Sequence, residues 1–201
     1  AHTRPPHLKA MIPQAIAANL LDREMGAVLR LGRVLWWSTV TLSPDQRRRH
    51  DATWGPRTIA EAERLWTVQD RVKWLWHLPL MEIPDDVMFG ISPHWRKWLQ
   101  DHATDHFGFE AKHARMEVPA LVTTGWYDQQ VGAIKNFTGL AENAATQKAR
   151  DNARLIVGPW THAGDQWDRK VGEVDFGPAA ERDYYEVADR WFSAWLKGDE
   201  T

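Results

Sequence analysis

The sequence predicts an α/β fold whose parallel sheet is interrupted by a long helical insertion. Residues 118–125 and 153–158 form short apolar runs that contain β-branched residues and end in glycine, as is typical of strands buried on both faces of a sheet. Each run is followed by a stretch in which apolar residues recur at helical spacing. Strands and helices that alternate in this way predict a parallel sheet.

The first element along the chain is a strand at residues 9–13, a short apolar run that a proline closes. Beyond it, as far as about residue 108, apolar residues recur at helical spacing. Prolines that can begin or end helices punctuate this segment at Pro44, Pro56, Pro79, Pro84 and Pro93. We therefore expect a core segment at 1–14 and a helical cap at 15–116, inserted between two strands of the sheet.

Residues 117–201 are expected to complete the core. A helix is expected over 133–149, between the strands at 118–125 and 153–158, because its apolar residues share one helical face. A last helix is expected over 179–197. It places four large side chains at helical spacing: Tyr184, Val187, Trp191 and Trp195.

Composition excludes several classes of function. The 201 residues include 25 Lys and Arg against 27 Asp and Glu, so the chain lacks the positive field of a dedicated nucleic-acid or anionic-membrane binder. It has no cysteine, which rules out disulfides and thiolate chemistry but leaves the compartment open. No run of about 18 apolar residues could span a bilayer. The sequence starts without Met and stops directly after a predicted helix, so we expect it to be part of a longer chain.

A polar residue follows each predicted strand, at the edge of the sheet where parallel α/β proteins place their chemistry. Asp128 follows 118–125, and His162 follows 153–158. Alone, such an Asp is usually a turn or helix cap and such a His is usually structural. At the ends of adjacent strands the two can meet, so that the carboxylate orients the imidazole as a general base. Their order along the chain also suits the Ser, Asp, His order of the α/β-hydrolase fold.

The segments around this pair resemble a known family. Residues 118–128 and 153–162 are similar to the cocaine esterase and X-Pro dipeptidyl-peptidase family of serine hydrolases, and so are 5–13, 175–180 and 191–198. The resemblance runs the length of the chain, most clearly from 117 to 198. It implies a partial α/β-hydrolase fold with an inserted helical cap. It also implies a serine acyl hydrolase that needs no cofactor, with Asp128 and His162 as the second and third members of a Ser-His-Asp triad.

The first member of such a triad is absent from this sequence. None of the four serines lies in a Gly-x-Ser-x-Gly nucleophile elbow: Ser38, Ser43, Ser92 and Ser193. Ser92 comes closest, but a proline follows it. The resemblance implies that the serine lies before Ala1, that a jelly-roll domain follows, and that the 201 residues alone are inactive.

The residues that flank the pair are expected to line a substrate pocket or to support the pair from behind: Trp126, Tyr127, Gln130 and Trp160. The cap supplies further tryptophans for the pocket, although most of them are expected in the core. These are Trp36, Trp37, Trp54, Trp66, Trp74, Trp76, Trp95 and Trp98. The expected partner is a small-molecule ester, an amide or a short peptide. Neither nucleic acid nor membrane is expected as a partner, and the oligomeric state is open.

Three readings compete with this one. His102 and His106 could share one helical face as zinc ligands, but the glutamate of a His-Glu-x-x-His motif is missing and no third ligand has a suitable spacing, so no metal is expected. The protein could also be a non-catalytic binding module on the same fold. A haloalkane-type hydrolase with an Asp nucleophile is disfavoured by the residues that precede Asp128 and His162.

Within the family, the residues leave the activity open between a carboxylesterase, an α-amino-acid ester hydrolase, a β-lactam acylase and an X-Pro dipeptidyl-peptidase. An exopeptidase needs acidic groups that hold the amino terminus of its substrate. Glu82, Asp85 and Asp86 could serve, but acidic residues are common on surfaces. We therefore favour an esterase-like acyl hydrolase.

Overall fold

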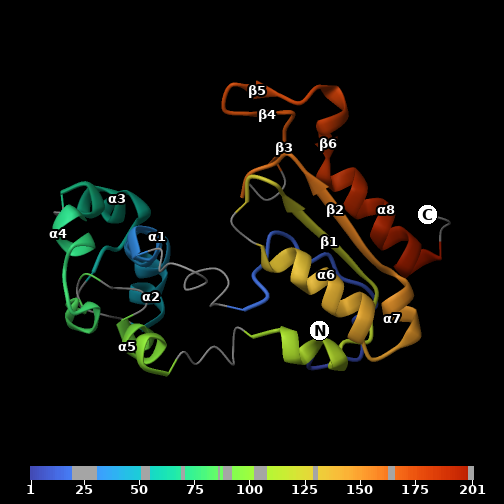
Figure 1. Cartoon of the computed structure of the whole chain (residues 1–201), viewed down its shortest axis with the longest axis horizontal. Coiled ribbons are helices and arrows are strands. Elements are labelled where there is room, and N and C mark those ends of the chain that lie inside the picture. Colours follow the sequence, from blue (N-terminus) through green and yellow to red (C-terminus); the bar gives the residue numbers. More distant parts are fainter. Residues whose placement is uncertain are drawn as a thin grey trace. The chain divides into compact units, whose positions relative to one another are not determined.

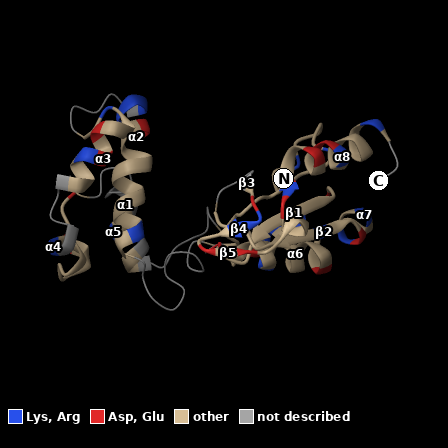
Figure 2. Ribbon diagram, turned by 90° about the horizontal axis from the view of Figure 1, so that it is seen from above, with Lys and Arg blue, Asp and Glu red and all other residues tan. Residues whose placement is uncertain are grey.

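The computed structural model describes residues 1–19, 31–50, 55–68, 71–85, 87, 92–101, 108–128, 131–162 and 166–198. The chain divides into two compact units, a sheet unit of residues 1–23 and 105–201 and a helical unit of residues 24–104 (Figure 1). Basic and acidic side chains are interspersed along the helices of both units (Figure 2). Among the described residues, no helix is both long enough and apolar enough to cross a membrane.

The centre of the sheet unit is a parallel pair of strands, β1 (Ala120–Gly125) and β2 (Ala153–Gly158). Their register aligns the first residues of the two strands and also the two terminal glycines. Both predicted strands are therefore present, and the α/β class is confirmed for this unit. Because the strands are parallel and in register, the loops that follow them leave the sheet side by side.

A third segment runs parallel to β1 on the side away from β2. It pairs through isolated bridges, from Met11 to Ala120 and from Gln14 to Thr123, rather than as a regular strand. Pro13 has no N–H to donate, but its carbonyl accepts a hydrogen bond from the Thr123 N–H at 3.1 Å. The strand predicted at 9–13 therefore lies in the sheet, although the proline prevents a regular ladder.

Helices cover both faces of β1, whose alternate residues point in opposite directions. Val122 packs in the cluster that includes residues of α6 (Gly132–Asn143). Leu121 packs instead with Trp191 of α8 (Tyr184–Lys197). The fully buried pattern of β1 follows from this double cover.

The helix predicted over 133–149 is in fact two helices, α6 and α7 (Gln147–Asp151). One cause of the break is the N-cap of α7, where the Thr146 hydroxyl accepts a hydrogen bond from the Ala149 N–H at 3.1 Å. The neighbouring Ala145 N–H is drawn away to the carbonyl of Met116 at 2.8 Å.

The last helix is shorter than predicted, because α8 starts at Tyr184. Asp183 caps it by accepting hydrogen bonds from the N–H groups of Tyr185 and Glu186, and Gly198 ends it at φ 81°. Before it, the chain makes two short antiparallel pairings that were not predicted. One joins β3 (Gln166–Trp167) to β6 (Arg182–Asp183), and the other joins β4 (Lys170–Val171) to β5 (Val174–Asp175). The 3₁₀ turn η5 (Pro178–Ala180) lies between β5 and β6 in the sequence.

All the described elements of the helical unit are helices: α1 (Leu31–Trp36), the π-helical η2 (Trp37–Leu42), α2 (Ser43–His50), α3 (Ile59–Val68), α4 (Arg71–Leu75), η3 (Leu80–Glu82) and α5 (Ser92–Asp101). Its buried side chains include Leu35, Ile83 and Trp95, and the Trp95 Nε1–H donates to the carbonyl of Leu80 at 2.9 Å. The role of this unit as a cap stays a prediction.

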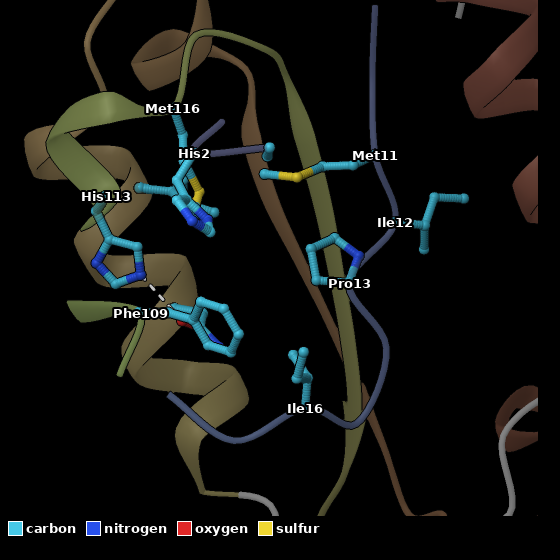
Figure 3. Close-up of a pocket in the computed structure, with 11 residues that line it drawn as sticks. His2, Met11, Ile12, Pro13, Ile16, Phe109, His113 and Met116 are labelled. Carbon is cyan, nitrogen blue, oxygen red and sulfur yellow. Dashed lines mark hydrogen bonds between the residues drawn. The ribbon is translucent and has the colours of Figure 1, made fainter. Parts of the chain in front are cut away.

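The two chain segments that connect the units meet within the sheet unit, and we call residues 17–19 and 108–110 the neck. The Phe109 N–H donates to the carbonyl of Ala18 at 2.8 Å. Gly132 of α6 lies so close to the neck that a Cβ there would be 2.0 Å from the Ala18 nitrogen. Beside the neck, a largely apolar cavity of about 270 Å³ opens between the segment 11–16, the turn before β1 and α6 (Figure 3).

Candidate active site

The ends of β1 and β2 carry the two residues that the sequence singled out. Pairing continues past the strands, because the Trp126 N–H donates to the Gly158 carbonyl at 2.8 Å and the Tyr127 N–H donates to the Trp160 carbonyl at 3.1 Å. These two bonds tie the loop that carries Asp128 to the loop that carries His162. Asp128 and His162 are distant in sequence, and these bonds bring their loops together in space.

The structure brings Asp128 and His162 into direct contact. Nδ1 of His162 lies 3.0 Å from Oδ2 and 3.1 Å from Oδ1 of Asp128. The Asp128 side chain is 1% exposed, whereas that of His162 is 46% exposed. An ionised carboxylate can only accept hydrogen bonds, so the proton of the neutral imidazole lies on Nδ1. Nε2 is then an acceptor, and within the described part of the chain nothing hydrogen-bonds to it. This is the arrangement of a general base.

Two glycines at paired positions make room for this arrangement. A Cβ on Gly125 would lie 2.0 Å from the carbonyl oxygen of Trp160, and a Cβ on Gly158 would lie 2.3 Å from the Trp160 indole. Both distances are shorter than any van der Waals contact. The glycine that ends each predicted strand is therefore required by the close approach of Trp160, in addition to its role as a strand terminator.

The four flanking residues fall into different environments. Trp160 is buried at 5% exposure, whereas Trp126 and Tyr127 are exposed at 69% and 52%. The Tyr127 ring lies 5.8 Å from the ring of Phe176, which no sequence pattern had indicated. Gln130 lies outside the described residues.

Residues 1–164 match the sequence model of the family described as X-Pro dipeptidyl-peptidase (S15 family). The chain belongs to this family. It is also similar to a characterised protein, since it is 28% identical over 209 residues to the cocaine esterase of Rhodococcus sp. (strain MB1 Bresler). That match covers 96% of this chain and 33% of the relative, so the chain spans about a third of the length of the relative. The family predicted from the sequence is confirmed.

The tryptophans of the helical unit in this S15-family chain are divided between core and surface. Trp95 is 1% exposed and belongs to the core of that unit, while Trp36 and Trp76 are 44% and 82% exposed. Trp37, Trp66 and Trp74 are half-buried. Trp54 and the side chain of Trp98 lie outside the described residues.

The absence of a metal site stays a prediction. The residues that the structure describes contain no group of three or more His, Asp or Glu side chains that could hold an ion. His102 and His106, the possible zinc ligands in the sequence, lie outside the described residues.

Proposed function

We propose that the protein is a serine acyl hydrolase in which His162 is the general base and Asp128 orients it. One observation carries this proposal: a buried carboxylate holds Nδ1 of a half-exposed imidazole at the carboxyl ends of two adjacent parallel strands. Membership of the S15 family and the similarity to a cocaine esterase support the same chemistry.

The proposed reaction proceeds through an acyl-enzyme. Nε2 of His162 takes the proton of a serine hydroxyl while that oxygen attacks an ester or amide carbonyl. Asp128 keeps the reactive tautomer in place and stabilises the imidazolium that forms. His162 then gives the proton to the leaving group. Water repeats the cycle on the acyl-enzyme and releases the acid.

We propose that the nucleophilic serine lies outside these 201 residues, so that the 201 residues alone turn over no substrate. The surroundings of the serines within the chain support this. Ser38 and Ser43 are buried in the helical unit, where the Ser43 hydroxyl donates to the Thr39 carbonyl at 2.5 Å. Ser193 lies on α8 and accepts from Lys197 Nζ at 3.1 Å. Ser92 starts α5 and does not stand in an elbow.

The proposed substrate is an ester or amide of a small molecule. Trp126 and Tyr127 are exposed directly before Asp128 and are assigned to substrate contact, whereas the buried Trp160 supports the pair. Gln130 is assigned to the same pocket on its position in the sequence. X-Pro dipeptidyl-peptidase activity is the second candidate, because the family carries that description. One of its candidate amine-binding carboxylates, Asp85, is already paired with Arg96.

The test is hydrolysis by the full-length protein that contains this sequence. A p-nitrophenyl ester and an Xaa-Pro p-nitroanilide are assayed with the wild type, His162→Ala and the surface control His7→Ala. We expect ester hydrolysis with a kcat that falls by about 10⁴-fold or more in His162→Ala and stays within about twofold in His7→Ala. Faster turnover of the anilide would favour the peptidase.

Two results would count against the proposal. A folded His162→Ala protein that keeps a tenth or more of the wild-type kcat would remove His162 from the mechanism. A folded full-length protein that hydrolyses neither compound would instead favour a binding module.

A further inference from the structure

The loop that carries His162 is anchored by the side chain of Trp160. This indole is buried, and its Nε1–H donates to the carbonyl of Ala180 at 2.9 Å. The carbonyl of the same residue accepts from the Tyr127 N–H, next to Asp128. Trp160 is therefore fastened by its main chain to one loop of the pair and by its side chain to the chain before α8.

The Trp160 indole packs against Trp167 and against Gly158. On one face it stacks on Trp167, with ring centroids 4.3 Å apart and an interplanar angle of 8°. The indole also packs against Gly158, where a Cβ would lie 2.3, 2.4 and 2.5 Å from three atoms of the ring. Similar distances to three ring atoms place the glycine over the face of the indole and not at its edge.

The stack continues from Trp167 to the first residue of α8. Trp167 is 5% exposed and meets Tyr184 edge to face, with centroids 5.4 Å apart and an angle of 75°. Trp167 also pairs with Arg182 in the β3–β6 ladder. Tyr184 is the first residue of α8. A continuous line of contacts thus joins α8 to the loop of His162.

We infer that Trp167 is a positioning residue of the Asp128–His162 pair: it presses the Trp160 indole against Gly158 and thereby fixes the two loops that hold the carboxylate and the imidazole. This inference rests on the proposed acyl-hydrolase function. His162 is half exposed, and within the described residues its only hydrogen-bond partner is Asp128. Its position therefore depends on the loop that carries it. A displacement of about 1 Å in such a group can cost about 10²-fold in rate.

The test compares Trp167→Leu and Trp167→Phe with the control Trp191→Leu in the full-length protein. Trp191 is also a buried tryptophan that meets another ring edge to face, but it packs between α8 and the sheet. Three quantities are measured: kcat and KM for a p-nitrophenyl ester, the melting temperature, and the downfield proton resonance of the His162 Nδ1–H, identified by its loss in His162→Ala.

We expect Trp167→Leu to lower kcat by about 10- to 100-fold with KM within about threefold, and to broaden or shift the Nδ1–H resonance. Trp167→Phe keeps a smaller stacking ring, so its kcat should fall by about three- to tenfold. Trp191→Leu should lower the melting temperature while kcat and the resonance stay close to those of the wild type. Should Trp167→Leu fail to fold, the graded loss in Trp167→Phe carries the test.

The inference is overturned if folded Trp167 variants keep the wild-type kcat and resonance, or if Trp191→Leu changes both as strongly. Its failure can be told apart from failure of the proposed function. The resonance reports the Asp128–His162 hydrogen bond without turnover, so a protein that hydrolyses no ester still shows whether Trp167 positions the pair.

Discussion

Two histidines of the sheet unit make similar hydrogen bonds and yet lie in different surroundings. His162 binds Asp128 through Nδ1 at 3.0 Å, and His113 meets the Asn136 amide oxygen through Nε2 at 2.9 Å. His113 is only 3% exposed, whereas the side chain of His162 is 46% exposed. A hydrogen-bonded histidine therefore does not by itself indicate a catalytic site. The charge of its partner and the access of solvent to its second nitrogen decide what it can do.

The second nitrogen of His113 is closed off. It packs against Gly139 so tightly that a Cβ there would lie 2.0 Å from Nδ1. Asn136, the hydrogen-bond partner of His113 (dashed line at His113 in Figure 3), also contacts the neck, because its Nδ2–H donates to the carbonyl of Ala17 at 3.3 Å. A hydrogen bond thus links α6 to the neck, whereas the loops of the Asp128–His162 pair are joined by backbone hydrogen bonds and carry the stacked Trp160.

The largest expected effect comes from making the partner of His162 resemble that of His113. Asp128→Asn replaces the carboxylate with an amide, which can hold the wrong tautomer and cannot stabilise an imidazolium. We expect kcat to fall by about 10⁴-fold in the full-length protein with little change in melting temperature. The check is steady-state ester hydrolysis with thermal unfolding in parallel. A loss of less than about tenfold in the folded variant would contradict the role of the charge.

Removing His113, which is linked to the neck through Asn136, should lower stability and leave catalysis unchanged. His113→Ala removes a buried ring and leaves the Asn136 amide oxygen without its partner, so the free energy of unfolding should fall by about 2–4 kcal/mol. The kcat per folded molecule should stay within about threefold. Urea unfolding and active-site titration measure the two quantities. A large loss of kcat in molecules shown to be folded would make His113 part of the catalytic machinery.

A matched pair of glycine substitutions sharpens the comparison. Gly139→Ala and Gly158→Ala each add a methyl group against a buried ring, of His113 and of Trp160 respectively, and each should lower the free energy of unfolding by about 1–3 kcal/mol. Only Gly158→Ala should also lower kcat, by about tenfold, because it displaces the residue that anchors the loop of His162. Equal effects of the two changes on kcat would mean that the two regions are not independent.

The smallest effect is expected at Asp175, which belongs to neither histidine region. The hydrogen bond from the Gly177 N–H, together with the nearby Arg169, holds the pKa of this exposed carboxyl below its ordinary value of 3.8. A depressed pKa stabilises the fold above the ordinary value, and this stabilisation is lost as the pH falls through the folded-state pKa. Asp175→Asn should therefore lower the melting temperature slightly at neutral pH, and the difference should vanish in acid. A difference that grows in acid would contradict the sign.

The sequence predicts the sheet better than it predicts the surroundings of the candidate site. The runs at 118–125 and 153–158 are found as strands because a strand buried on both faces must be apolar throughout, a pattern that is local to the sequence. The break between α6 and α7 was missed, since it depends on a single Thr146 cap and on a distant carbonyl. Helical periodicity does not contain that information.

The stacking partner of Trp160 could not be predicted for a similar reason. Trp167 and Tyr184 come from a short ladder between β3 and β6 whose strands have two residues each, too short for any pattern to emerge. The available signal was the density of aromatic residues after His162. The sequence indicates that Gly125 and Gly158 end the two strands, but their close contact with Trp160 appears only in three dimensions.

The most direct test of the proposed triad is covalent labelling of the full-length protein with a serine-reactive fluorophosphonate, followed by mass mapping. We expect one labelled serine, outside residues 1–201, and a labelling rate that falls by about 10³-fold or more in His162→Ala and stays near the wild-type rate in folded His113→Ala. Labelling at one of the four serines of this sequence, or at a rate unchanged by His162→Ala, would contradict the assignment of Asp128 and His162 to a catalytic triad.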